Sequence, residues 1–369
     1  MKIGLVCPYN IYKSGGVQEC VLALRAEYIK LGHKAVIITP KPRGRNLPPI
    51  EGVELVGDAR DIKSPFHTTA QVSASFDNAQ IDEVLQKYNF DILHFHEPWV
   101  PIVSRQILTR SNTTNVATFH AKLPETMMSR SIEKVITPYT KSILKYIDAY
   151  TAVSEAATDY IASLTTETIH IVPNGIDYAK YQTKATKKPH NHSIVYIGRL
   201  EKRKGVIYLL QAFDKLKYYL PDAKLIIAGD GPDRAKLENF VDINNIHNVE
   251  FKGYIKESTK IKLLQNASIF CSPAIYGESF GIVLLEAMAS GTVTVAGNNP
   301  GYTSVLKDTG NLSIVNVKDT TEFARKLQLL LTNQELRDLW ISWAKDYVTQ
   351  FSYDKIAKSY LKIYKDAKK

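Results

Sequence analysis

Short runs of β-branched and other apolar residues alternate with longer segments of helical periodicity along most of the chain. Ile3–Val6 is the first such run, and after a Gly15-Gly16 loop apolar residues recur at helical spacing from Val17 to Leu31. This alternation is typical of βαβ units and predicts parallel sheets. The later runs that we expect to form strands in the first half of the chain are Ala35–Thr39, Val53–Val56, Asp91–His94, Val116–Phe119, Tyr150–Val153 and Ile169–Val172.

The alternation is interrupted between Asp177 and His192, where the chain is polar, rich in lysine and without apolar periodicity. Such a stretch is typical of a linker between two domains. A second series of strands and helices follows it. Its expected strands are Ser193–Gly198, Ala223–Ala228, Val249–Phe251, Ile269–Pro273, Val293–Ala296 and Leu312–Val315, and its expected helices lie near Val206–Lys217, Asp233–Val241, Thr259–Gln265, Phe280–Ser290 and Thr321–Leu331.

The pattern therefore predicts an α/β protein of two doubly wound, Rossmann-like domains that face each other across a cleft. We expect residues 1–172 to form the first domain and residues 173–352 the second. Two helices without a following strand end the chain, and we expect the last, at about 353–369, to pack back on the first domain. Ligands of such folds bind at the carboxyl ends of the strands, so the loops after the strands are candidate sites.

Composition narrows the class of protein. Of the 369 residues, 44% are hydrophobic and 23% are charged, which is ordinary for a folded globular protein. The three cysteines, Cys7, Cys20 and Cys271, form no CxxC pair, which excludes a disulfide scaffold and a zinc knuckle. No apolar run approaches the ~20 residues of a membrane-spanning helix, and we expect no signal peptide, because Pro8 and Tyr9 follow the short run from Ile3 to Cys7. We therefore expect a cytoplasmic protein, with a peripheral contact on the inner face of the membrane as an open alternative.

The net charge indicates an anionic partner. Lys and Arg number 47 against 37 Asp and Glu, a net charge of +10. Nucleic acid, an anionic membrane and a phosphorylated small molecule all fit such an excess. Residues 1–172 hold 18 basic and 17 acidic side chains, whereas residues 173–369 hold 29 and 20, so the excess lies almost wholly after residue 172. Because the sequence contains no nucleic-acid reading motif, we expect no nucleic-acid partner.

Several familiar phosphate and metal motifs are absent from the sequence. There is no GxxxxGK loop and no Asp-x-Asp pair, and Gly229-Asp230-Gly231 lacks the third glycine of a dinucleotide fingerprint. His94 and His96 share one face of an expected strand and Glu97 follows them, but a polar strand end before Pro98 explains these residues better than a metal site. We therefore expect no metal requirement and no bound cofactor.

Gly277-Glu278-Ser279-Phe280-Gly281 matches the nucleophile elbow of serine hydrolases, and its strand–turn–helix context fits that motif. Ser279 would then be the nucleophile. In the hydrolase order the general-base histidine follows the serine, whereas all nine histidines of this chain precede Ser279. A serine hydrolase is thus the alternative of a different class, without a base in the expected place.

The same segment has a second interpretation, as a site for a sugar and a diphosphate. Glu278 lies in a loop and Glu286 about two turns into the following helix, a spacing that lets both carboxylates face the cleft. Carboxylates accept hydrogen bonds from vicinal sugar hydroxyls. Between them, Phe280, Gly281 and Ile282 offer backbone N–H groups at the start of a helix, which is a natural seat for a diphosphate.

A cationic loop follows the first strand of the second domain. Arg199, Lys202, Arg203 and Lys204 fall within six residues, directly before Gly205. A run of charges is usually a solvated surface, but this one lies at the carboxyl end of an expected strand. From there, Arg199 and Lys204 can neutralise a diphosphate leaving group without a metal.

Together these residues resemble the retaining nucleotide-sugar glycosyltransferases of family 4, which have the two-domain GT-B fold. The resemblance spans nearly the whole chain, and its N-terminal pieces are most similar to the phosphatidylinositol α-mannosyltransferases. The matching pieces are Val6-Cys7-Pro8-Tyr9, Gly15-Gly16-Val17-Gln18, Leu31 to Val36, Asp91 to Pro98, Thr118-Phe119-His120, Val172 to Asp177, Gly198 to Gly205, and the pair Glu278 and Glu286.

The resemblance implies a role for each matching residue. Glu278 would hold the transferred sugar through its hydroxyls, Glu286 would hold the ribose, and His120 would face the sugar. The residues implied to be catalytic are Arg199, Lys204, Glu278 and His120; those implied to bind the donor are Gly15, Gly16, Arg203, Ile255, Lys256, Lys260, Ser279, Phe280, Gly281, Ile282 and Glu286; and those implied to bind the acceptor are Tyr9 and Gln18.

The implied reaction is transfer of a hexose with retention. The acceptor hydroxyl attacks from the face that the diphosphate leaves, so no protein nucleophile is required. We expect mannose from GDP-mannose, with UDP-glucose or another UDP-hexose as the alternative donor. The expected acceptor is a lipid or a glycan, with phosphatidylinositol as a candidate. Electrostatic stabilisation of the leaving diphosphate should be the main catalytic contribution.

One segment departs from the resemblance. The phosphatidylinositol mannosyltransferases carry a strongly basic lipid-docking helix, whereas the stretch from Asp77 to Tyr88 here holds Asp77, Asp82 and Glu83 against Lys87 alone. An interfacial helix normally presents cationic side chains, and anionic lipid repels an acidic one. The Lys-rich terminal helix is then the remaining basic surface for a membrane.

Overall fold

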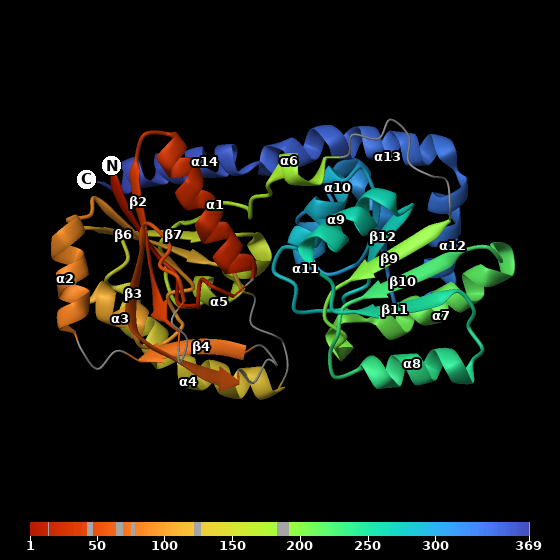
Figure 1. The fold of residues 1–369 in the computed structure, drawn as a ribbon, viewed down its shortest axis with the longest axis horizontal. Helices are drawn as coiled ribbons and strands as arrows, with labels where there is room; N and C mark the ends of the chain where they lie inside the picture. Colours follow the sequence, from red (N-terminus) through yellow and green to blue (C-terminus); the bar gives the residue numbers. More distant parts are fainter. Residues whose placement is uncertain are drawn as a thin grey trace. The chain divides into compact units, whose positions relative to one another are not determined.

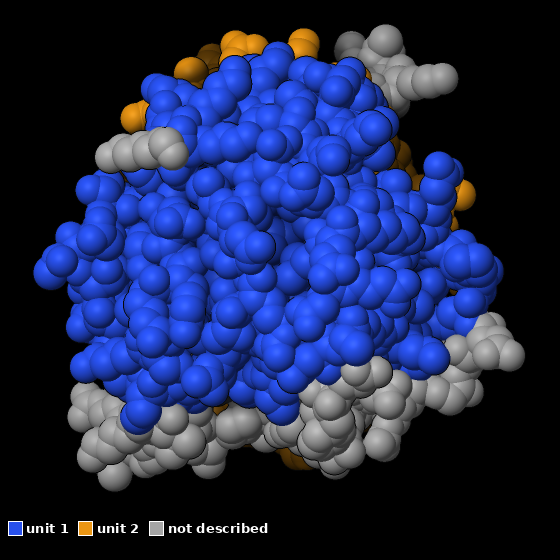
Figure 2. Space-filling view, turned by 90° about the vertical axis from the view of Figure 1, so that its left-hand side faces the viewer, with its two compact units in different colours: residues 1–175, 353–369 blue, residues 176–352 orange. Residues whose placement is uncertain are grey.

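The structure is a computed structural model that describes residues 1–13, 15–42, 47–63, 69–74, 78–121, 127–182 and 192–368, with the backbone alone for 58–63, 69–74 and 127–135. The chain divides into two compact units (Figures 1 and 2). Unit 1 comprises residues 1–175 and 353–369, and unit 2 comprises residues 176–352. Each unit is built on its own sheet, flanked by helices (Figure 1).

The sheet of unit 1 has the strand order β4-β3-β2-β1-β5-β6-β7-β8. Neighbouring strands are parallel except β3 and β4, which pair antiparallel. The central strands are buried and carry mostly apolar side chains on both faces, as expected where helices cover a parallel sheet. The strands are β1 (Lys2–Val6), β2 (Lys34–Lys41), β3 (Val53–Lys63), β4 (Thr69–Ala74), β5 (Ile92–His96), β6 (Thr114–Phe119), β7 (Ala149–Ala152) and β8 (Ile169–Ile171).

The helices of unit 1 connect these strands, apart from the last one, which ends the chain and packs against α1. That terminal helix buries one face because Ile356, Tyr360 and Tyr364 recur every four positions, which places them on the same side. The helices are α1 (Gly16–Lys30), α2 (Ala79–Tyr88), α3 (Val103–Leu108), α4 (Met127–Leu144), α5 (Glu155–Ala162) and α14 (Tyr353–Ala367).

Unit 2 has a parallel sheet with the strand order β11-β10-β9-β12-β13-β14. Its strands are β9 (Ser193–Ile197), β10 (Lys224–Ala228), β11 (Val249–Gly253), β12 (Ile269–Ser272), β13 (Val293–Gly297) and β14 (Ile314–Val315). Its helices are α6 (Tyr178–Tyr181), α7 (Val206–Tyr219), α8 (Arg234–Ile243), α9 (Glu257–Asn266), α10 (Ile282–Ala289), α11 (Pro300–Thr303), α12 (Thr320–Thr332) and α13 (Gln334–Tyr347), and short 3₁₀ turns lie at Lys202–Lys204, Asp308–Ser313 and Val348–Phe351.

The fold class predicted from the sequence, two parallel-sheet α/β domains, is confirmed. The sequence pattern misses β4 and ends β3 too early, at Val56 rather than Lys63. The added part of β3 carries Asp58, Arg60 and Asp61, and β4 contains one large aliphatic residue, Val72. Because β4 and the added part of β3 lack an apolar pattern, their antiparallel pairing cannot be recognised from periodicity.

The prediction of a linker from Asp177 to His192 is wrong for its first part. Asp177 caps α6 by accepting a hydrogen bond from the Lys180 backbone N–H, and Tyr181 is buried within unit 2. Residues 183–191 of the predicted linker lie outside the described residues. One amphipathic turn is too short to give a recognisable helical period, which explains the error.

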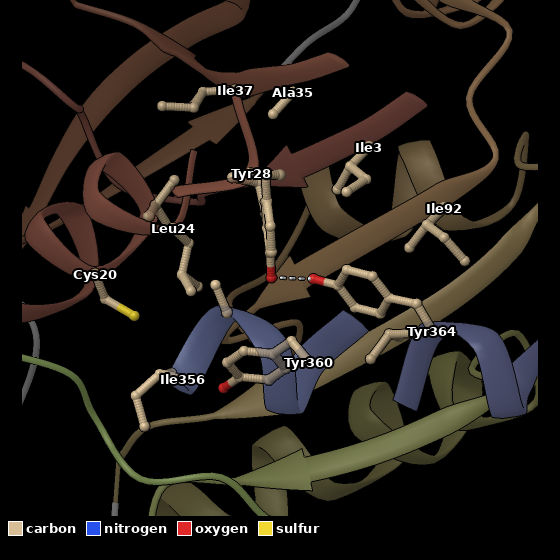
Figure 3. Packing of buried hydrophobic residues seen from close by; sticks show 14 of the residues in the cluster. Ile3, Cys20, Leu24, Tyr28, Ala35, Ile37, Ile92, Ile356, Tyr360 and Tyr364 are labelled. Carbon is tan, nitrogen blue, oxygen red and sulfur yellow. Dashed lines mark hydrogen bonds between the residues drawn. The ribbon is translucent and has the colours of Figure 1, made fainter. Parts of the chain in front are cut away.

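The core of unit 1 encloses a line of hydrogen-bonded polar side chains. The hydroxyls of Tyr28 on α1 and Tyr364 on α14 lie 2.9 Å apart (Figure 3), and the Tyr364 hydroxyl lies 2.7 Å from Nδ1 of His94. Nε2 of His94 lies in turn 2.6 Å from the Thr118 hydroxyl. All four side chains are buried, so these hydrogen bonds satisfy groups that water cannot reach. They tie α1 and α14 to the centre of the sheet.

This core makes the stability of unit 1 depend on pH. Burial, with His120 close by, lowers the pKa of His94 to about 3. Below pH ~6.5 the unfolded chain protonates this imidazole while the folded chain does not, so stability falls as the pH falls toward 3. We expect His94→Gln to reduce the pH slope of the free energy of unfolding, between pH 4 and 6, by about 1.4 kcal/mol per pH unit. Urea unfolding at stepped pH measures it, and equal slopes for wild type and variant would contradict it.

Candidate functional site

The loops at the carboxyl edge of the unit 2 sheet are tied together through their backbones. The N–H of Leu200, after β9, donates to the carbonyl of Asp230, after β10, at 2.9 Å. The N–H of Ile275, after β12, donates to the carbonyl of Arg203 at 2.8 Å. Gly205 makes this second approach possible, because it has φ +67° and a side chain there would strike the Pro273 carbonyl. The strands thus hold three loops in fixed register along one edge.

Glu278 is bound to Lys204, which was predicted to neutralise the diphosphate, and to Arg203, which was predicted to bind the donor. Its Oε1 accepts hydrogen bonds from Nη1 of Arg203 at 2.6 Å and from Nζ of Lys204 at 2.7 Å. Arg203 also donates to the Gly277 carbonyl at 3.1 Å. The three charged side chains are between 12% and 24% exposed, so solvent screens their interaction only in part.

Arg203 lies between two carboxylates. Its Nη2 is 2.7 Å from Oε1 of Glu201, whose side chain is only 8% exposed. Burial alone would lower the pKa of Arg203, but Glu278 and Glu201 raise it, so the guanidinium stays charged. Among the predicted cations, Arg199 is exposed, and no ion pair of Arg199 occurs within the described part of unit 2.

Glu286 belongs to a separate network deeper in unit 2. Its Oε1 accepts hydrogen bonds from Lys260 Nζ and from the Tyr181 hydroxyl, each at 2.7 Å. Glu257 binds the same two side chains: it accepts a hydrogen bond from the Tyr181 hydroxyl at 2.8 Å and forms an ion pair with Lys260 at 3.0 Å. It also forms an ion pair with Lys180. Burial would raise the pKa of Glu257, but these hydrogen bonds lower it to about 2. Sequence reasoning missed Tyr181 because it assigned that residue to a linker.

Glu278 and Glu286, which were predicted to face one cleft, bind different side chains in the structure. The two carboxylates follow the same strand, but their described hydrogen bonds share no partner. Lys260, which the resemblance implies to bind the donor, forms an ion pair with Glu286. Ile255 is half-buried and Lys256 is exposed at the N-cap of α9, and the described ion pairs place neither in these two networks.

The start of α10 is shaped for close backbone approach. Gly281, its N-cap, has φ +107°, and a side chain there would meet the buried ring of Tyr302 at 2.7 Å. Phe280 is buried and packs edge-on against Phe351, so its side chain is structural. Ser279 and Ile282 flank this turn. Gly281 has no side chain to cap this turn, and the Leu284 N–H donates to the Gly281 carbonyl at 2.9 Å, so the N–H groups of Ile282 and Val283 are the candidates for binding an anionic ligand.

In unit 1, three histidines meet at the carboxyl edge of the sheet. His94 and His96 share one face of β5, with ring centroids 4.2 Å apart, and Nδ1 of His96 lies 2.8 Å from Nε2 of His120, which follows β6. Burial lowers the pKa of His120 to about 4 and that of His96 well below its ordinary value. Neutral imidazoles can form this pair, with one ring donating and the other accepting.

Glu97 is a functional candidate whose role sequence reasoning did not identify. It follows β5 with φ +53°, a strained conformation for a side-chain-bearing residue, and it is buried. Its Oε1 accepts the backbone N–H groups of His120 at 2.5 Å and Ala121 at 2.6 Å. Burial raises the pKa of Glu97 to about 7, although these hydrogen bonds and the Trp99 side chain oppose the shift. Glu97 therefore fixes the loop that carries His120.

The residues of unit 1 predicted to contact the acceptor and the donor, apart from His120, follow the carboxyl end of β1. Tyr9 follows β1, and its hydroxyl has a pKa raised by burial and by the neighbouring Glu97. Gly15 and Gly16 open α1, and Gln18 in its first turn folds back over Gly15. The structure thus gathers Tyr9, Glu97 and His120 at neighbouring strand ends.

Two alternative sites find no support in the described residues. No group of three or more His, Cys, Asp or Glu side chains there could hold a metal ion. Ser279 follows β12 at the carboxyl edge, whereas His192 and His247, the histidines of unit 2 that the structure describes, precede β9 and β11 at the opposite edge. The described part of unit 2 therefore offers no histidine base for a serine hydrolase.

Comparison with known proteins identifies both halves of the chain. The profile of the family "Glycosyltransferase Family 4" matches residues 14–180, and that of "Glycosyl transferases group 1" matches residues 177–347. The phosphatidyl-myo-inositol mannosyltransferase of Mycolicibacterium smegmatis is 29% identical over 99% of this chain and 93% of its own length.

Solved structures share the fold of the whole chain. Sucrose-phosphate synthase of Thermosynechococcus elongatus aligns with a TM-score of 0.77 at 18% identity, covering 99% of this chain and 98% of its own. Anabaena Alr3699/HepE in complex with UDP and glucose aligns with a TM-score of 0.76 at 18% identity, covering 99% of each chain. The chain therefore belongs to the GT-B glycosyltransferases, with a family 4 domain followed by a group 1 domain.

Proposed function

We propose that this glycosyltransferase moves mannose from GDP-mannose to a lipid or glycan acceptor, with phosphatidylinositol as the first candidate. Similarity over the whole chain to a phosphatidyl-myo-inositol mannosyltransferase supports the sugar and the acceptor. The observation that carries the reaction type is the cluster of Arg203, Lys204 and Glu278 at one strand edge of unit 2. It combines cations for a diphosphate with a carboxylate for sugar hydroxyls.

A UDP-hexose is the alternative donor. The neighbour Anabaena Alr3699/HepE holds UDP and glucose on the same fold, although at 18% identity. The side chains that would bind phosphate and sugar serve either donor, since both carry a diphosphate and vicinal hydroxyls. The two donors differ in the nucleobase and in the configuration of the sugar.

The proposed mechanism is same-face transfer with retention. Arg199 and Lys204, with Arg203 beside them, would bind the diphosphate, and the N–H groups at the start of α10 would add to the stabilisation of the negative charge that grows on it. His120, held by Glu97, would face the transferred sugar, while Tyr9 and Gln18 would contact the acceptor. Cationic side chains then supply the leaving-group stabilisation, and we propose that transfer needs no metal.

Removal of the Lys204 or the Glu278 side chain from the cluster should abolish most of the transfer activity. We expect Lys204→Ala and Glu278→Ala each to lower kcat/KM by about 10²- to 10³-fold, the usual loss when one stabilising group is removed. Transfer of labelled mannose, with folding checked by circular dichroism, measures this. Lys202→Ala is the matched control, because Lys202 is an exposed lysine on the same turn. Near-normal turnover in both test variants would refute the assignment.

The donor can be identified with a panel of radiolabelled nucleotide sugars, scored first by hydrolysis and then by transfer. We expect GDP-mannose to give the highest kcat/KM because the mannosyltransferase relative aligns along the whole chain. A higher value for UDP-glucose would replace the proposed donor by the alternative while leaving the reaction type intact.

A membrane contact, if the acceptor is a lipid, would use α14 rather than α2. In α2 the single cation, Lys87, is bound to Glu54 at 2.8 Å, while Glu83 is exposed; Asp77 lies outside the described residues. Figure 1 shows α14 at the surface, and no described helix is both long and apolar enough to cross a membrane. The lysines exposed on α14 are Lys355, Lys358, Lys362 and Lys365.

The terminal helix also changes the distribution of charge. Because α14 belongs to unit 1, unit 1 holds 24 basic and 19 acidic side chains and unit 2 holds 23 and 18, so each unit carries a net charge of +5. Because residues 1–172 are nearly neutral, the positive net charge of unit 1 comes mainly from the lysines at the end of the chain.

Liposome flotation tests this contact. We expect binding to phosphatidylinositol-containing vesicles at low salt, weakened at least about 30-fold by Lys362→Glu with Lys365→Glu, because each lysine near an anionic surface contributes about 1 kcal/mol. Lys236→Glu with Lys262→Glu, at exposed sites of unit 2, makes the same charge change as a control. Failure of the wild type to float would leave a soluble or neutral-lipid acceptor.

A further inference from the structure

Glu278 binds the cations that the proposed function assigns to the donor diphosphate. A single oxygen, Oε1, accepts from both Arg203 and Lys204, at 2.6 and 2.7 Å. The carboxylate thus lies where an anionic oxygen of a ligand would meet the same two donors. A diphosphate that takes the same N–H groups of Arg203 and Lys204 displaces the carboxylate from them.

The charges of this cluster cancel. Arg203 and Lys204 supply two positive charges, and Glu278 and Glu201 supply two negative charges, with Arg203 bridging the carboxylates. While Glu278 stays on the two cations, the cluster therefore offers no excess positive charge. Partial burial of these side chains keeps their interaction strong, because solvent screens it incompletely.

An intact nucleotide sugar and the nucleoside diphosphate product differ in what they offer Glu278. The nucleotide sugar brings sugar hydroxyls, which can donate hydrogen bonds to the carboxylate as it leaves Arg203 and Lys204. The product brings no sugar, and its terminal phosphate carries an additional negative charge. In the product complex the displaced carboxylate has lost its cations, gained no donor from a sugar and faces a more negative ligand.

We infer that Glu278 determines specificity by acting as an internal counter-ion that disfavours the nucleoside diphosphate relative to the nucleotide sugar. This inference rests on the proposed function, because it takes the cluster to be the donor site. It gives Glu278 a second role, the release of product, beyond contact with the sugar. Glu201 has no such role, since its described ion pair is with Arg203 alone.

The test compares the Kd values of GDP and of GDP-mannose, measured by isothermal titration calorimetry without acceptor, for the wild type, Glu278→Gln and Glu201→Gln. We expect Glu278→Gln to lower the Kd of GDP at least tenfold, about 1.4 kcal/mol, without lowering the Kd of GDP-mannose. The ratio of the two Kd values then shifts at least tenfold toward GDP. Glu201→Gln removes an equal charge beside Arg203. It should therefore strengthen the binding of both ligands to the same extent and leave the ratio of the two Kd values unchanged.

A GDP affinity of Glu278→Gln equal to or weaker than that of the wild type would overturn the inference, as would an equal change of the ratio in Glu201→Gln. If Glu278→Gln does not fold, Glu278→Ala is measured in the same way and judged by the same ratio. UDP and UDP-glucose replace the GDP pair if they bind the wild type more tightly. Wild type that binds neither pair would overturn the proposed function itself, and with it the inference.

Discussion

The ion pairs of Glu278 with Arg203 and Lys204 are the interaction on which the functional site of unit 2 depends. Glu278 lies about 75 positions after Arg203 and Lys204 in the chain. They meet because β9 and β12 are neighbouring parallel strands, so the loops after them leave the sheet at the same edge. Backbone hydrogen bonds between these loops, and Gly205 under the Pro273 carbonyl, hold the charged groups in place. The apolar sheet thus positions the polar site.

Unit 1 places its polar groups by a different means. His94, His96 and His120 are buried, and hydrogen bonds to Thr118 and Tyr364 hold His94 while His96 holds the His120 ring. Because burial keeps these imidazoles neutral, they pair with one another without repulsion. The terminal helix α14 completes this arrangement. The last residues of the chain therefore support a strand end that belongs to its first half.

The sequence was sufficient to predict the parallel strands, because each is a short apolar run between helical segments. It failed for β4 and Tyr181, where one aliphatic residue or a single helical turn leaves no period to detect. The cationic loop and Glu278 could be recognised as candidates from their positions after strands. Their mutual ion pairs could not, nor could the pairing of Lys260 with Glu286, because contacts between distant loops depend on register and side-chain conformation. The role of Glu97 in holding the His120 loop was not identified, because its backbone conformation and its hydrogen bonds leave no trace in the sequence pattern.

A crystal structure of the protein with an intact nucleotide sugar tests the central claim most directly. The account predicts that the diphosphate contacts Lys204 and Arg203 at the carboxyl edge of the unit 2 sheet, and that Glu278 has left these cations and accepts hydrogen bonds from the sugar hydroxyls. A diphosphate bound elsewhere, with Glu278 still paired to both cations, would contradict it.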